Sequence, residues 1–171
     1  MNHREMNERR RDAAAAVVNG KIFCCGGWNK RSLSSVECYD PPSNSWTLIS
    51  PMKSPCFHFG AIEINGILLI VGKDSDDLNS SNPVWLLDFI NNKWIEQPRP
   101  LQKRNYCTAV RLGEEVLICG GIYNDDNETD TVEIFDGIQW RNGPKLPKSA
   151  LDSPIVAISI EFSEYLLSIS T

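Results

Sequence analysis

The residue types that most often perform chemistry are few and scattered in this chain of 171 residues. There are two histidines, His3 and His58, and six cysteines, with no Cys-x-x-Cys pair. A zinc site needs clustered Cys and His ligands, and nucleophilic catalysis needs a Ser or Cys held beside a base. No local motif supplies either arrangement. We therefore expect no catalytic residue, no metal and no cofactor, and we interpret the cysteines as free, buried thiols.

Two acidic runs raise the question of calcium. They cover residues 74–77 (DSDD) and residues 125–130 (DDNETD). A calcium-binding EF-hand loop needs a glycine at its sixth position and a glutamate at its twelfth. Neither run has that spacing, so we interpret both as solvated loops.

Arginines, asparagines and aromatic residues are better suited to binding a protein. Arg, Trp and Tyr dominate the energetics of many protein interfaces, and guanidinium groups pair bidentately with carboxylates. The candidate partner-binding residues are Arg9, Arg10, Trp28, Asn29, Arg31, His58, Arg104, Tyr106, Tyr123 and Asn124. They predict a protein substrate or an acidic peptide as the partner. An alternative, open for Arg9 and Arg104 above all, is that the arginines brace neighbouring loops.

A repeated unit positions these candidates. Each unit begins with two apolar strands joined by a tight turn, of which Asn19-Gly20 is an example. The second strand ends at a glycine pair, and a loop, a third strand, a turn and a tryptophan follow. The unit recurs about every 50 residues. Its structural markers are Gly26, Gly27, Tyr39, Trp46, Gly72, Trp94, Gly120, Gly121, Phe135 and Trp140, and an apolar residue closes each unit at Met6, Met52, Leu101 and Leu146.

In the first unit we predict strands at 13–18, 22–25, 35–39 and 46–49, with the second strand buried on both faces. The markers follow the repeat and not any single site, so we assign them to packing between units. Lys73 stands where the second glycine of a pair is expected.

A period near 50 with a double glycine and a later tryptophan resembles the kelch repeat. The stretches MNERRRDAAAAVVNGKIFCCGG and SVECYDPPSNSW are similar to the kelch-like (BTB-kelch) family in particular. The resemblance implies an all-β fold, a partial β-propeller of four-stranded antiparallel blades with about three complete units. The expected divisions are a lead-in with the end of a preceding unit (1–12), three repeats (13–52, 53–101 and 102–146) and the start of an incomplete fourth (147–171).

The strand order predicts where a partner binds. If the four strands A to D of a unit alternate in direction, the B–C and D–A loops emerge at the same end of every blade, and binding residues concentrate on such loops. The candidate partner-binding residues lie on these loops.

The family resemblance implies substrate recognition for a cullin-RING ubiquitin ligase, in which the propeller holds a protein destined for ubiquitination and proteasomal degradation. In that family a BTB domain engages the cullin, and these 171 residues contain none, so cullin contact is expected only through such a domain. The alternative is an actin-binding cytoskeletal kelch protein. Two further alternatives stay open, a fragment of a longer chain and a ring closed by self-association.

Composition narrows the remaining classes of function. The net charge of −5 and the pI of about 5.1 argue against nucleic acid or an anionic membrane as partner. No apolar run approaches the roughly 18 residues of a membrane helix, and the start MNHREMNERRR lacks the apolar core of a signal peptide. We therefore expect a cytoplasmic protein that is not an enzyme.

Overall fold

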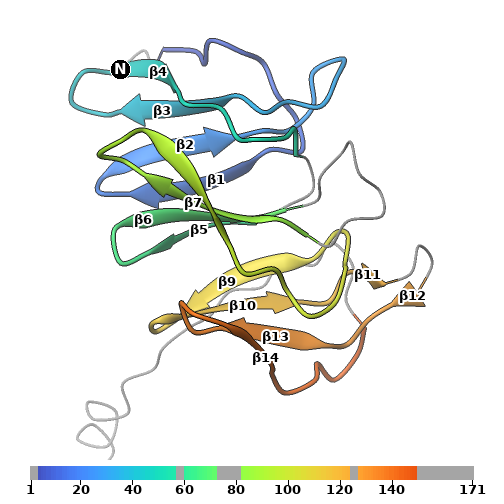
Figure 1. Cartoon of the computed structure of the whole chain (residues 1–171). Helices are drawn as coiled ribbons and strands as arrows, with labels where there is room; N and C mark the ends of the chain where they lie inside the picture. Colours follow the sequence, from blue (N-terminus) through green and yellow to red (C-terminus); the bar gives the residue numbers. More distant parts are fainter. Residues whose placement is uncertain (1–3, 57–59, 73–81, 124–126, 150–171) are drawn as a thin grey trace, which may run out of the picture.

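The computed structural model describes residues 4–56, 60–72, 82–123 and 127–149. Within these ranges the chain forms fourteen β-strands and no helix, and hence no helix long and apolar enough to cross a membrane. Twelve strands make three four-stranded antiparallel sheets, in which each strand pairs with its neighbour in the repeat (Figure 1). The all-β, bladed fold predicted from the sequence is confirmed.

The strand bounds follow the repeat. Blade 1 contains β1 (Ala14–Val18), β2 (Lys21–Cys25), β3 (Val36–Asp40) and β4 (Ser45–Ile49). Blade 2 contains β5 (Gly60–Ile64), β6 (Ile67–Val71), β7 (Val84–Asp88) and β8 (Lys93–Gln97). Blade 3 contains β9 (Thr108–Leu112), β10 (Glu115–Cys119), β13 (Val132–Phe135) and β14 (Trp140–Asn142). A short hairpin of β11 (Ile122–Tyr123) and β12 (Asn127–Glu128) projects from the B–C connection of blade 3.

Local sequence accounts for the turns. Asn19 and Gly20 both have positive φ, 51° and 75°, as a two-residue hairpin turn of the favoured twist requires. An aspartate closes the third strand of blades 2 and 3, where its carboxylate accepts backbone N–H groups of the following turn. In blade 2 this residue is Asp88, and in blade 3 it is Asp136.

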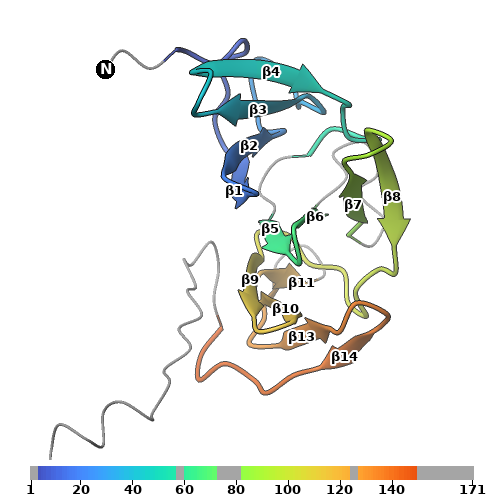
Figure 2. The ribbon, with the colours of Figure 1, turned by 90° about the vertical axis from the view of Figure 1, so that its left-hand side faces the viewer.

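The three blades form an arc. The inner strands β1, β5 and β9 lie side by side on its concave side, and the outer strands β4, β8 and β14 lie on its convex side (Figure 2). One apolar cluster fills the seam between blades 1 and 2, and a second fills the seam between blades 2 and 3. β2 differs from expectation, because Ile22 is partly exposed on the side of blade 1 that faces away from blade 2.

The marker tryptophans join each blade to the segment that enters it. The Nε1 group of Trp94 donates to the carbonyl oxygen of Ser50 at 2.9 Å, and that of Trp140 donates to Pro98 at 2.7 Å. Trp46 does the same to Arg4 at 3.1 Å, but its ring is only partly buried. The buried rings therefore combine apolar burial with a satisfied polar atom.

One of the apolar residues predicted to close a unit, Leu101, is one position away from the residue that does so in the structure. Met52 lies four residues before the buried Cys56, and its backbone N–H donates to Ser34. The corresponding residue at the end of the second unit is the buried Pro100, four residues before Arg104, whereas Leu101 is exposed. The sequence did not distinguish two adjacent apolar residues.

Trp94 is buried and Trp46 is only partly buried, so removing the two rings should destabilise the protein by different amounts. We expect Trp94→Ala to lower the free energy of unfolding by ~3–5 kcal/mol, as for a fully buried aromatic ring. Trp46→Ala should cost less because its ring already contacts solvent. Chemical denaturation of both variants measures the difference, and equal losses would contradict the assignment of Trp94 to the seam between blades 1 and 2.

Candidate protein-interaction face

The D–A and B–C loops come together at one end of the blades. Arg11 and Trp28 exchange two backbone hydrogen bonds, of 3.1 and 2.7 Å, between the segment entering blade 1 and its B–C loop. Asn105 and Ile122 form the same pair in blade 3, at 3.0 and 2.7 Å. The expectation that these loops share one end is therefore correct for the described part of these two blades.

The second glycine of each pair permits this close approach. A Cβ added to Gly27 would lie 2.5 Å from the carbonyl oxygen of Arg11, and one added to Gly121 would collide with that of Asn105. Gly27 and Gly121 also have positive φ, 92° and 95°. In blade 2 the residue at this position is Lys73, which lies outside the described residues.

Arg10, a predicted binding residue, has its side chain inside blade 1. Its Nη1 donates to the carbonyl oxygens of Gly26 and Ser35 at 2.8 and 3.0 Å, and its Nη2 donates to Glu37 at 2.7 Å. The side chains of Arg10 and Glu37 are 1% and 0% exposed. The carboxylate of Glu37 also accepts the backbone N–H groups of Asn7 and Glu8.

Arg104 repeats this arrangement in blade 3. Its Nη1 donates to the carbonyl oxygens of Gly120 and Thr131, and its Nη2 donates to Glu133, with both side chains of the ion pair fully buried. Glu133 in turn accepts the backbone N–H of Leu101. The placement of Arg10 and Arg104 on an exposed face is corrected, and the alternative that such arginines brace loops describes both.

Blade 2 carries a different pair at the same positions. Cys56 lies sixteen residues before Gly72, as Arg104 does before Gly120, and Trp85 occupies the site of Glu133 in the third strand. Both Cys56 and Trp85 are buried in the apolar cluster between blades 1 and 2. An apolar pair therefore replaces the buried ion pair in this blade.

The remaining cations of blade 1 form a basic surface. A hollow of about 420 Å³ is lined by Arg9, Arg10, Arg11, Trp28, Asn29 and Lys30. Arg9 and Lys30 are exposed. The Arg11 side chain is 73% exposed, although its Nε lies 3.8 Å from Oδ2 of Asp12. An adjoining hollow of about 320 Å³ includes Arg31, Glu8 and Pro55. We name the surface formed by Arg9, Arg11, Trp28, Asn29, Lys30 and Arg31 the basic loop surface.

Arg11 was not among the sequence candidates. The signal that could have found it is the alternation of an extended segment, in which neighbours of a buried residue point outward. Arg9 and Arg11 flank the buried Arg10 in this way.

Backbone strain occurs on the same loops. Lys30 has a φ of 59° and Asp12 has a φ of 53°. Tyr106, the counterpart of Asp12 in blade 3, has a φ of 56°, which is unusual for a bulky residue. Such conformations concentrate at binding sites, where the surrounding structure holds them.

Of the other predicted binding residues, Tyr106 is placed by the structure away from the basic loop surface. Tyr106 lies in the segment entering blade 3 and is half-buried. Tyr123 belongs to β11, in the B–C connection of blade 3. His58 and Asn124 lie outside the described residues, as do the acidic run 74–77 and most of the predicted fourth unit.

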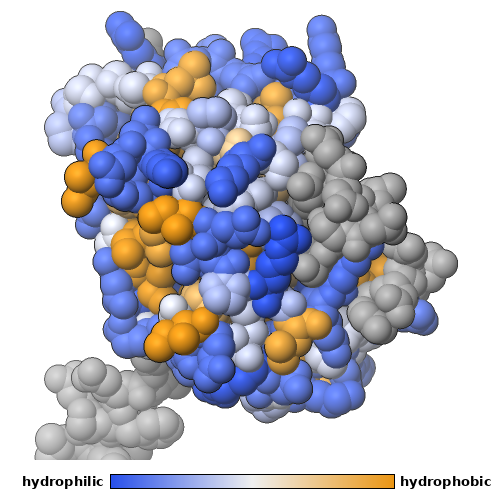
Figure 3. Space-filling view, in the orientation of Figure 1, coloured by the Kyte–Doolittle hydropathy of each residue, from blue (hydrophilic) through white to orange (hydrophobic). Residues whose placement is uncertain are grey.

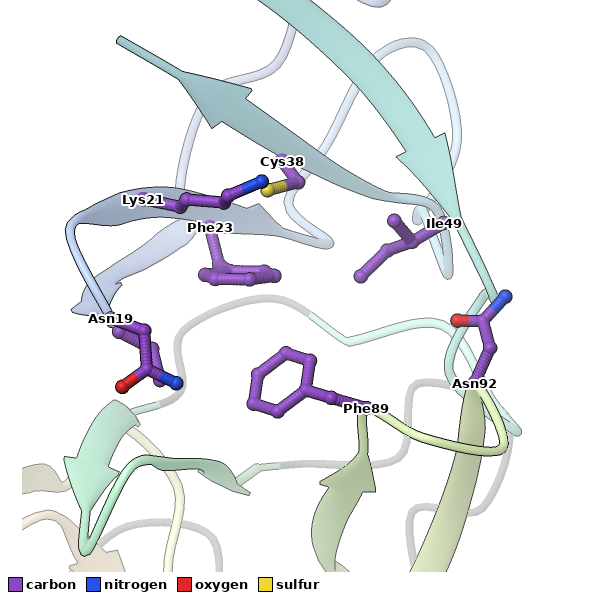
Figure 4. A pocket seen from close by; sticks show the side chains of 8 residues that line it. Asn19, Lys21, Phe23, Cys38, Ile49, Phe89 and Asn92 are labelled. Atoms are coloured by element: carbon purple, nitrogen blue, oxygen red, sulfur yellow. The ribbon is translucent and has the colours of Figure 1, made fainter. Parts of the chain in front are cut away.

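A second hollow lies at the opposite end of the seam between blades 1 and 2. It encloses about 380 Å³ beside the A–B turn of blade 1 and the C–D turn of blade 2. Figure 4 shows Phe23 and Phe89 facing each other across it, with ring centroids 5.2 Å apart. In the view of Figure 3 the apolar surface forms separate patches among hydrophilic residues. Among the residues that line this hollow only Lys21 carries a charge, in contrast to the cations of the basic loop surface.

The described residues show no arrangement suited to metal chemistry, since none of their His, Cys, Asp and Glu side chains form a group of three or more able to hold an ion. The six cysteines all lie within the described residues and form no disulfide; four are buried and two, Cys24 and Cys38, are partly buried. Burial raises the pKa of the Cys107 thiol to about 11. A protonated, buried thiol is a poor nucleophile.

Three blades of this kind, with inner strands along one axis and loops gathered at one end, define part of a β-propeller. The Kelch motif family model matches residues 9–53 and 103–147, more than half of the chain, and the chain therefore belongs to the kelch-repeat family. Blade 2, which lacks the Arg–Glu pair, lies between the two matched segments.

Several curated proteins are similar to this chain. Kelch-like protein 25 of Xenopus tropicalis is 27% identical over 149 residues, covering 84% of this chain and 25% of that protein. Alpha-scruin of Limulus polyphemus is 24% identical over 144 residues, covering 77% of this chain and 16% of that protein. The influenza virus NS1A-binding protein of Homo sapiens is 37% identical over 78 residues, covering 43% and 12%. The chain thus spans a quarter or less of these relatives.

A solved structure supports the fold alone. The structure of YjhT superposes with a TM-score of 0.68 at 18% identity and covers 81% of this chain and 53% of that one. At this identity the likeness concerns architecture, and it confirms the propeller arrangement.

The buried ion pair of blade 3 can be tested against the apolar pair of blade 2. We expect Glu133→Gln to lower the free energy of unfolding by ~3–5 kcal/mol, because it leaves the Arg104 cation buried without its counterion. The double variant Arg104→Cys/Glu133→Trp removes both charges and should lose less stability than the sum of the losses of the single variants Arg104→Cys and Glu133→Trp. Urea denaturation of the native protein, these two single variants and the double variant measures the coupling energy, and additive losses would contradict a coupled pair.

Glu37 predicts a loss of stability in acid. Burial alone would raise its pKa, but hydrogen bonds from Arg10, Asn7 and Glu8 lower the pKa below the ordinary value of 4.5. A depressed folded-state pKa contributes stability that is complete above the unfolded value and is lost as the pH falls through the folded one. We expect the melting temperature of the native protein to fall below pH 4.5 more steeply than that of Glu37→Gln. If the melting temperatures of the two proteins fell in parallel with pH, Glu37 would not be responsible for the loss of stability in acid.

Proposed function

We propose that this chain is a protein-binding module whose basic loop surface holds an acidic peptide or loop of a partner protein. The observation that carries the proposal is the gathering of exposed Arg9, Arg11, Lys30 and Arg31 around Trp28 in a chain with a net charge of −5. Arginine beside an aromatic ring is the composition of interface hot spots. In this proposal the chain acts by binding and not by catalysis, with blades that pack together and present the loops that carry these residues.

The biological role that fits this module best is substrate recognition for a cullin-RING ubiquitin ligase, in the cytoplasm. The similarity to Kelch-like protein 25 supports it, because the resemblance to the kelch-like family implies a propeller that holds the substrate and a BTB domain that reaches the cullin. In this role the basic loop surface selects the substrate. The assignment is tested by expressing the protein in its own cells and asking whether a cullin copurifies with it. Deletion of any BTB segment should abolish this copurification.

An actin-binding cytoskeletal role is the alternative that the kelch resemblance leaves open. Cosedimentation with actin filaments separates the two roles. Pelleting of the chain with filaments, unaffected by competing acidic peptide, would favour actin and count against the ligase role.

The binding surface itself is tested with a fluorescein-labelled peptide rich in Asp and Glu. We expect the double variant Arg9→Glu/Lys30→Glu to weaken binding about tenfold or more, which corresponds to ~1.4 kcal/mol. Added salt should weaken binding to the native protein as well, because exposed charges are screened. Fluorescence anisotropy gives both dissociation constants.

A matched control comes from the opposite end of the blades. Lys93→Glu reverses an exposed charge at the start of β8, next to the C–D turn, and should leave peptide binding unchanged. If Lys93→Glu and the double variant weakened binding equally, only net charge would matter and the basic loop surface would not be the site.

A further inference from the structure

The two hollows at the loop end of blade 1 are lined by different charges. The hollow of about 420 Å³ is lined, within the described residues, by cations, a tryptophan and an asparagine, and we call it the cationic hollow. The adjoining hollow of about 320 Å³ is lined by a cation, Arg31, and an anion, Glu8, together with Ser32, Ser34 and Ser35. We call it the mixed hollow. The two hollows therefore favour different side chains of a partner.

Glu8 lies at the edge of the hydrogen-bond network of Arg10. Its Oε2 accepts a hydrogen bond from the Ser35 hydroxyl at 2.5 Å and lies 3.8 Å from Nη2 of Arg10. The Glu8 side chain is 26% exposed, so a ligand in the mixed hollow can reach it. Arg10 also pairs with Glu37. Two carboxylates and one guanidinium leave one net negative charge beside the mixed hollow.

Blade 3 shows that a blade can be built without this negative charge. Its residue at the position of Glu8 is Gln102, which likewise lies two residues before the buried arginine. The Thr131 hydroxyl donates to Oε1 of Gln102 at 3.2 Å, as the Ser35 hydroxyl donates to Glu8. The buried arginine of blade 3 donates to the same oxygen at 3.4 Å. An amide thus makes the structural hydrogen bonds, and the charge of Glu8 is left for another purpose.

Arg31 supplies the positive charge of the mixed hollow. It is exposed on the B–C loop of blade 1, where the Asn29 N–H donates to the Arg31 carbonyl oxygen at 2.9 Å and closes a tight turn. Among the described residues, no acidic side chain forms an ion pair with Arg31, although Glu8 lines the same hollow. The guanidinium can therefore donate to a ligand.

These two charges determine which side chain fits. A carboxylate in the mixed hollow would be attracted by Arg31 and repelled by Glu8, and an ammonium group would meet the reverse. The side-chain amide of Asn or Gln is uncharged and has both an acceptor oxygen and an NH₂ donor. It can accept from Arg31 while it donates to Glu8, and both hydrogen bonds then involve an ionised group.

We propose that the mixed hollow binds an Asn or Gln side chain of the partner, beside acidic residues held by the cationic hollow, and that Glu8 enforces this choice. The inference rests on the proposed function, in which the basic loop surface holds an acidic peptide. Glu8 and Arg9 are adjacent in the chain and line different hollows. An extended peptide, at ~3.3 Å per residue, can therefore enter both hollows with side chains a few residues apart.

A set of fluorescein-labelled peptides tests the proposal by anisotropy. Each peptide has the same run of Asp residues, a glycine spacer of varied length, and then Gln, Glu, Lys or Ala. We expect the Gln peptide to bind the native protein about fivefold more tightly than the Ala peptide at the best spacer, as one net hydrogen bond gives. The Glu peptide should bind more weakly than the Gln peptide despite its additional negative charge. The opposite order would overturn the proposal.

Variants of the two charged residues should change the selection. Glu8→Gln should let the Glu peptide bind at least as tightly as the Gln peptide, and Arg31→Gln should reduce the penalty on the Lys peptide. Glu5→Gln is the matched control, because Glu5 is exposed in the same entering segment and lines neither hollow. It should leave the order of the peptides unchanged. Equal effects of Glu8→Gln and Glu5→Gln would contradict the role of Glu8, and circular dichroism shows whether each variant is folded.

The double variant Arg9→Glu/Lys30→Glu separates this inference from the proposed function. If the double variant weakens binding of all the peptides but the native protein binds them equally, the acidic-peptide site remains and the mixed hollow selects nothing. If the double variant binds every peptide as the native protein does, the proposed function fails and this inference fails with it.

Discussion

The packing of one blade face on the next is the contact on which the rest of the structure depends. A single four-stranded sheet has two faces and cannot bury either by itself, so its apolar residues are stabilised only when another sheet covers them. The two seams supply most of the buried apolar side chains among the described residues. The loops that form the candidate binding face hold their positions because the strands that carry them are fixed in these seams.

A second constraint is the space between each entering segment and the third strand. In blades 1 and 3 an arginine fills it, bonded to loop carbonyls and to a glutamate that in turn accepts N–H groups of the entering segment. In blade 2 Cys56 and Trp85 fill it with apolar volume. Both solutions are physically reasonable, because replacing a buried ion pair by packed apolar residues is often neutral. The ion pair adds direction, since its hydrogen bonds specify which backbone atoms meet.

Three consecutive arginines show how environment separates structural from binding residues. Arg9 and Arg11 are exposed and line a hollow beside Trp28, while the side chain of Arg10 between them is buried. The same residue type therefore stabilises the blade at one position and offers positive charge to a partner at the next. Their spacing follows from an extended backbone, in which successive side chains point to opposite sides.

The amino-acid sequence by itself determined the architecture. Its repeated strand patterns, Asn-Gly turns, glycine pairs and tryptophans specified three blades and placed the strand ends of blade 1 to within one residue, because period-two apolar patterning and turn residues act locally. Only the tertiary structure decided which arginines are buried, that Pro100 and not Leu101 closes a unit, and that Cys56 and Trp85 replace an ion pair. These outcomes depend on contacts between residues far apart in the chain, and a side chain's exposure is set by those contacts and not by its neighbours in sequence.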